Sequence, residues 1–91
     1  MIDGNTARRG VLSSILRREI AERLDIAIDR LPLSMREVFV LRFIEELDYA
    51  EIAELVEVTP ATARVRAHRA RALLRTELGP VADTMWREPP A

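Results

Sequence analysis

The stretch that decides the fold runs from Thr59 to Arg75 and reads TPATARVRAHRARALLR. Its first two residues favour a helix start, because the Thr59 hydroxyl can accept a bond from a free amide and Pro60 suits the first helical position. Gly79-Pro80 marks the end of the same helix. At about 100° per residue, small apolar side chains fall on one side. These are Ala63, Ala67, Ala70 and Leu74, and the opposite side carries Ala61, Arg64, Val65 and His68. The pattern predicts a long helix that packs by one face and exposes a basic one.

A second, shorter helix is expected immediately before it, over residues 48–56. Asp48 is a good N-cap, and Glu51 stands three residues later, as in a capping box. Such a cap stabilises a helix by roughly 0.5–2 kcal/mol. Only Glu57 and Val58 join the two helices, so the pair cannot separate. The sequence therefore predicts a helix-turn-helix over residues 48–78.

Two further helices are expected upstream. Apolar residues recur at helical spacing from about Val11 to Arg30, and Leu31-Pro32 ends that pattern. Ser34 then restarts the chain with a second capping box, and a central helix runs to about Glu46. We thus expect an all-α, four-helix domain over residues 11–79, preceded by a flexible arm or linker over 1–10 and followed by a C-terminal tail over 80–91.

Composition excludes several classes of function. The 91 residues suit one domain, and the chain has no cysteine and a single histidine, so neither a disulfide nor a metal cluster is expected. No signal peptide and no bilayer-spanning run is present in the sequence, which favours a cytoplasmic protein without a membrane partner. His68 has no nucleophile nearby in sequence, so we expect no enzyme, no cofactor and no small-molecule substrate.

Charge is separated along the chain although its sum is only −1. Acidic residues crowd the stretch from Glu45 to Glu57, whereas arginines crowd the last helix. Because screening limits charge interactions to about 8–10 Å, the local charge decides what binds there. All fourteen basic residues are arginine. Arginine favours bidentate phosphate and guanine contacts, and a GC-rich coding bias is the alternative explanation.

From about Ala27 to Leu78 the chain resembles region 4 of bacterial sigma factors, most of all the extracytoplasmic-function group. The resemblance rests on four pieces of sequence. They are Leu31-Pro32 with Arg36-Glu37-Val38, then Leu41-Arg42-Phe43, then LDYAEIA over 47–53, and finally Thr62 leading to His68-Arg69-Ala70-Arg71 and Leu74-Arg75. A helix-turn-helix alone is common, but its combination with these flanking motifs is specific.

The resemblance implies binding of the promoter minus-35 element in the major groove and docking on the β flap of RNA polymerase core. It also implies an anti-sigma factor as a partner. Carried over residue by residue, the positions facing bases or adjoining phosphates are Thr62, Arg64, Val65, His68 and Arg69, and those contacting backbone phosphate are Arg42 and Tyr49. The residues themselves support this, because Arg64 can pair with guanine and the helix start from Pro60 to Thr62 offers amides to a phosphate.

Three positions depart from the family pattern. Val65 stands where a small polar residue is usual, and Ala63 and Ala67 stand where larger aliphatic residues pack. The chain also has no room for the region that reads the minus-10 element, so it is either part of a longer sigma factor or a free-standing sigma-like regulator. Two alternatives stay open: a regulator that binds an anti-sigma factor or RNA polymerase without reading DNA, and the helix-turn-helix output domain of a transcriptional activator.

Overall fold

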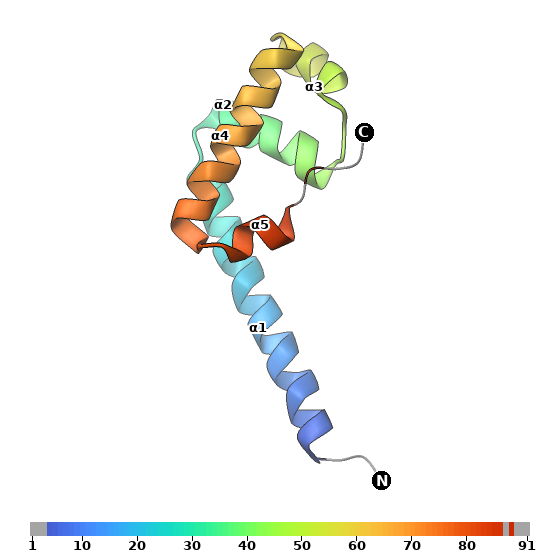
Figure 1. The fold of residues 1–91 in the computed structure, drawn as a ribbon, viewed down its shortest axis with the longest axis vertical. Helices are drawn as coiled ribbons and strands as arrows, with labels where there is room; N and C mark the ends of the chain where they lie inside the picture. Colours follow the sequence, from blue (N-terminus) through green and yellow to red (C-terminus); the bar gives the residue numbers. More distant parts are fainter. Residues whose placement is uncertain (1–3, 87, 89–91) are drawn as a thin grey trace.

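The computed structural model describes residues 4–86 and residue 88, with side chains for 14–83, 86 and 88. These residues form helices joined by short turns and contain no strand, which confirms the all-α class (Figure 1). The α-helices are α1 (Gly4–Asp29), α2 (Leu33–Phe39), α3 (Tyr49–Val56), α4 (Pro60–Leu78) and α5 (Val81–Met85). A π-helical segment, η1 (Val40–Ile44), continues α2. None of the helices in this described part has the length and apolarity needed to cross a bilayer.

Helix α1 begins at Gly4, well before the predicted start at Val11. The flexible arm expected over residues 1–10 is therefore wrong for residues 4–10, and residues 1–3 lie outside the described chain. Once a helix is nucleated each further residue adds a hydrogen bond at little cost, and the glycine at position 10 costs only about 1 kcal/mol. The first half of α1 extends away from the other helices (Figure 1). Its apolar stripe becomes buried only from Leu24 onward, while Leu16 is 56% exposed.

The core is built around α2, as the concentration of apolar residues in this segment predicts. Val38 and Phe39 are fully buried, and the Phe39 ring lies 5.0 Å from that of Phe43. Ile52 from α3 and Leu74 from α4 complete the set of fully enclosed large side chains. Burying each of these is worth about 1.5–3 kcal/mol, so this cluster holds α3 and α4 against α2.

Helix α2 starts at Leu33, and the capping box expected at Ser34 is wrong. The carbonyl of Pro32 accepts bonds from the amides of Met35 and Arg36, both at 2.9 Å, and no side chain caps the helix. Pro32 follows the turn after α1, and its extended backbone, with ψ 142°, places this carbonyl where it accepts the first hydrogen bonds of α2. The helix boundary is therefore set by the backbone of Pro32.

Segment η1 widens the end of this helix. The amide of Glu45 bonds to the carbonyl of Val40 at 3.0 Å, five residues back, which is the π pattern. The amide of Leu47 then reaches the carbonyl of Leu41, and Glu46 adopts a left-handed φ of 58°. This wide turn leads directly into α3.

Helix α4 packs with the face that the sequence predicts. Three of its five alanines, Ala63, Ala67 and Ala70, are fully buried, and Leu74 is 1% exposed. Three of these four buried side chains are only methyl groups, from which we infer that the backbone of α4 approaches its neighbours closely. The alanines that depart from the family pattern thus mark close helix packing.

The end of the chain folds back onto the domain. Gly79 takes a φ of 78° and stops α4, after which α5 places Ala82 in the core. The Trp86 ring then packs edge-on against Phe39 with centroids 4.7 Å apart. The expected boundary at Gly79 therefore falls too early, because α5 and Trp86 belong to the packed domain. Of the expected tail, residues 87 and 89–91 lie outside the described chain.

Candidate nucleic-acid interface

Helices α3 and α4 form the predicted helix-turn-helix, with both expected caps in place. The Asp48 carboxylate accepts from the amide of Glu51 at 2.8 Å, and the Thr59 hydroxyl accepts from the amide of Thr62 at 3.1 Å. Between them Glu57 takes a left-handed φ of 59°, which turns the chain within two residues. The caps fix where each helix begins, so the residues on the outer side of α4 hold a defined position.

The exposed side of the first turns of α4 carries six of the eight predicted DNA-binding residues. We call this surface the reading face. It comprises Pro60, Thr62, Arg64, Val65, His68 and Arg69, of which Thr62 is half-buried and the others are exposed. Arg64 and Arg69 offer forked donors suited to guanine or phosphate, and the Val65 side chain, 46% exposed, offers methyl groups suited to thymine. The face thus combines hydrogen-bond donors with one apolar contact.

Tyr49 lies beside the reading face and orients one of its arginines. The Arg64 guanidinium sits 5.0 Å from the centre of the Tyr49 ring, and the Arg42 guanidinium sits 4.3 Å from it. Guanidinium groups at these distances are attracted by the ring face. Tyr49 itself is only 7% exposed, so it positions Arg64 from below the surface.

Arg42 and Tyr49 are both buried, whereas residues that contact a DNA phosphate are expected to be exposed. The Arg42 side chain is buried, with Nε donating to Glu88 Oε1 at 2.9 Å and Nη1 donating to the carbonyl of Leu47 at 2.9 Å. The Tyr49 hydroxyl donates to the same Oε1 at 2.5 Å. The wide turn of η1 directs Arg42 inward, and Glu88 supplies the counter-charge. Their roles as phosphate contacts stay predictions, since Glu88 now holds both donors.

The shared carboxylate shifts the protonation equilibria of its partners. Burial, followed by the hydrogen bond to Glu88 and its negative charge, raises the pKa of Tyr49 to about 12. Burial would also raise the pKa of Glu88, but hydrogen bonds from Tyr49 and Arg42, with the charges of Arg42 and His68, hold it below its usual value. At neutral pH the cluster therefore contains a protonated phenol and an ionised carboxylate.

Arg71 completes this cluster from α4. Its guanidinium lies 3.8 Å from Glu88 Oε2 and 4.0 Å from the Asp83 carboxylate, and it stands 5.4 Å from the Phe43 ring centre. Glu77, which lies on the same helix as Arg71, pairs instead with Arg30 at 3.7 Å. No local pattern pointed to Glu88 or Asp83, because both reach the site only after the chain has turned back at Gly79.

Within residues 4–86 and 88, no three histidine, cysteine, aspartate or glutamate side chains gather closely enough to hold an ion. The arrangement offers cationic donors to an anionic partner.

Comparison with known proteins assigns the fold to a family. Residues 21–74, more than half of the chain, match the model of the family described as Sigma-70, region 4. The chain belongs to this family. The matched range contains α2, η1, α3 and most of α4. It therefore includes the whole reading face, and it ends before α5. Membership confirms the resemblance drawn from the sequence and favours it over the activator class of helix-turn-helix proteins.

Curated relatives agree on the group within the family. The ECF RNA polymerase sigma factor SigW of Bacillus subtilis is 35% identical over 71 residues, covering 76% of this chain and 38% of the relative. The ECF RNA polymerase sigma-E factor of Haemophilus influenzae is 32% identical over 79 residues, covering 87% of this chain and 40% of the relative. The chain therefore spans 40% or less of the length of these two relatives. No significant match was found among solved structures.

Proposed function

We propose that this region 4 domain binds a promoter minus-35 element through the reading face and so contributes to transcription initiation by a sigma factor of the extracytoplasmic-function group. The observation that carries the proposal is the capped α4 helix, whose alanine face is fully buried while Arg64, His68 and Arg69 are exposed on the other side. A helix held in this way can enter a major groove with its first turns. Arg64 and Arg69 would then supply guanine or phosphate contacts.

Docking on the β flap of RNA polymerase core is the second part of the proposal. A groove between α2–η1 and the end of α3 is lined by both apolar and charged side chains. The lining residues are Arg36, Glu37, Val40, Leu41, Leu55, Val56 and Glu57. Leu55 is 63% exposed there, so the groove offers apolar surface to a partner. An apolar segment of the polymerase would cover this groove, and an anti-sigma factor would compete for the same surface.

The test is selection of duplexes from a random DNA pool, followed by fluorescence anisotropy of the enriched sequence across a salt series. Arg64→Ala and Arg69→Ala should each weaken binding by about 1–3 kcal/mol, or about 5- to 150-fold, and relax the preference for the selected sequence. Arg17→Ala is the matched control, because Arg17 is exposed on the projecting part of α1. It removes the same charge and should change affinity by no more than about two-fold.

Failure of the pool to yield a motif even at low salt would contradict the promoter-binding proposal. Retention of the polymerase flap or an anti-sigma factor by the same protein would then favour the alternative of a sigma-like regulator that binds proteins without reading DNA. Equal losses in Arg17→Ala and Arg64→Ala would likewise show that only overall charge attracts the DNA.

A further inference from the structure

One carboxylate near the end of the chain is held by donors from three separate elements. Glu88 receives the Nε–H of Arg42 from η1 at 2.9 Å and the hydroxyl of Tyr49 from α3 at 2.5 Å. The guanidinium of Arg71 from α4 lies 3.8 Å from its other oxygen. We call Arg42, Tyr49 and Arg71 the anion cradle. Donors that converge in this way from three elements form a defined site for an oxyanion.

The chemistry of the cradle suits a phosphate as well as a carboxylate. Both anions present paired oxygens, and guanidinium forks together with hydroxyl groups are the donors that proteins use for DNA backbone phosphate. The Arg42 side chain is 10% exposed, which strengthens its charge interaction, while the Glu88 side chain is 36% exposed. The bound carboxylate therefore sits at an opening of the cradle toward solvent, where another anion can reach.

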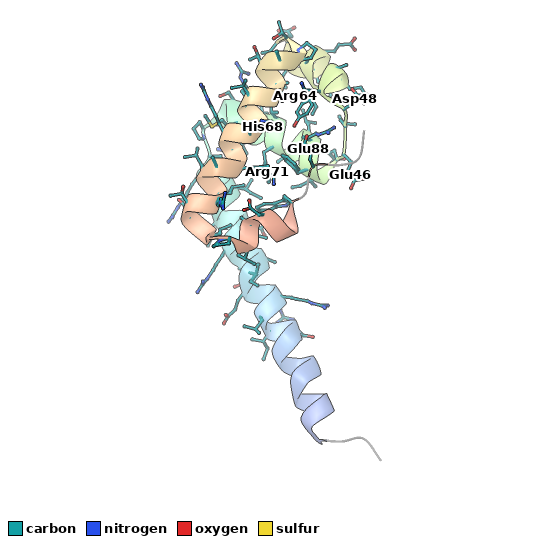
Figure 2. All side chains as sticks on the ribbon, in the orientation of Figure 1. Glu46, Asp48, Arg64, His68, Arg71 and Glu88 are labelled. Carbon is teal, nitrogen blue, oxygen red and sulfur yellow. The ribbon has the colours of Figure 1, made fainter. Side chains whose placement is uncertain are left out.

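The cradle adjoins the reading face. Arg64, which lies on that face, also contacts the ring of Tyr49 at 5.0 Å. Arg64, His68 and Arg71 follow one another along α4 at a spacing that places them on one side of the helix (Figure 2). The charge of His68 contributes to keeping Glu88 ionised. A duplex that meets Arg64 and His68 is thus brought up to the same surface that Glu88 occupies.

Arg42 and Tyr49 are already predicted to contact backbone phosphate, and we propose that in the free domain Glu88 fills the anion cradle they form with Arg71, so that Glu88 competes intramolecularly with a phosphate of duplex DNA. This inference rests on the proposed DNA-binding function. The Trp86 ring, packed edge-on at 4.7 Å from Phe39, anchors the segment two residues away and keeps the carboxylate at a high effective concentration. DNA then binds only to the fraction of molecules whose cradle is open, which lowers the apparent affinity by that fraction.

The test compares Glu88→Gln with Glu77→Gln in the full chain, using anisotropy with the selected duplex and with an unrelated duplex. Glu77 is the matched control because it is also an ion-paired glutamate, bound to Arg30 instead of to the cradle. Glu88→Gln should bind about three- to ten-fold more tightly than Glu77→Gln. The gain should be similar for both duplexes, since a phosphate contact carries no sequence information.

A second measurement follows the wild-type protein and does not depend on the fold of a variant. The Nε–H resonance of Arg42 should shift when the duplex is added, because its acceptor changes from carboxylate to phosphate. Two results would overturn the proposed competition by Glu88 while leaving the proposed function intact, provided that the wild type binds DNA. One is that a folded Glu88→Gln variant binds no more tightly, and the other is that the Arg42 resonance does not move. Absence of binding to any duplex by both proteins would overturn the two together.

Discussion

Replacing Ala67 with leucine should destabilise this domain, although the resemblance drawn from the sequence led us to expect a larger aliphatic residue at this position. Ala67 is fully buried on the face of α4 that packs on the core. Because Ala67 is 0% exposed, we expect an isobutyl group in place of the methyl to push α4 outward or to take a strained rotamer. Overpacking of this kind costs about 1–3 kcal/mol. For a domain of this size that lowers the melting temperature by about 4–20 °C.

The measurement is thermal and urea denaturation followed by far-ultraviolet circular dichroism, with Ala72→Leu as the matched control. Ala72 lies on the same helix but is exposed, so the substitution changes helix propensity equally and adds no buried volume. It should alter the free energy of unfolding by no more than about 0.5 kcal/mol. If Ala67→Leu proves as stable as Ala72→Leu, there is room beside Ala67, and the close approach of α4 inferred here is refuted.

Two further predictions concern the helix end and the buried phenol. Gly79→Ala should cost about 1–3 kcal/mol from backbone strain alone, since φ 78° and ψ −170° suit only glycine and no atom lies within 4 Å of an added Cβ. An unchanged urea midpoint would show that this helix end relaxes freely. Tyr49 is the single tyrosine, so tyrosinate absorbance reports its pKa of about 12 directly. Because that pKa is raised on folding, its stabilising contribution is complete below about pH 10 and is lost as pH rises toward 12. Glu88→Gln should lower the midpoint, and equal midpoints would contradict the carboxylate's part in the shift.

The helix-turn-helix could be predicted from the sequence because its signals are local. The caps at Asp48 and Thr59, the proline at position 60 and the stop at Gly79 act within a few residues, and the structure contains each of them. The buried face of α4 could be predicted from the helical spacing of its apolar residues, since every third or fourth residue is apolar. The reading face could then be predicted as the opposite, exposed side of the same helix.

The cluster around Glu88 could not be predicted because it depends on contacts between distant residues. Glu88 lies 46 positions from Arg42, and it reaches the site only because α5 reverses the chain and Trp86 packs on Phe39. The π turn at Val40–Ile44 also carries no local sequence signal that we recognise, yet it decides that Arg42 points inward. The start of α1 was missed because glycine and polar residues lower helix propensity without forbidding a helix.

The π turn should tolerate substitutions and deletions to different degrees. Substitutions within Val40–Ile44 alter single side chains, but loss of one residue would let this turn close as an ordinary α-helix. Since an α-helix turns by about 100° per residue, everything after the deletion would be rotated by that angle relative to α2. Arg42 and Tyr49 would no longer face each other, and both the helix-turn-helix and its cradle would lose their alignment. Natural variation here should therefore consist of exchanges of residues and contain no single-residue gaps.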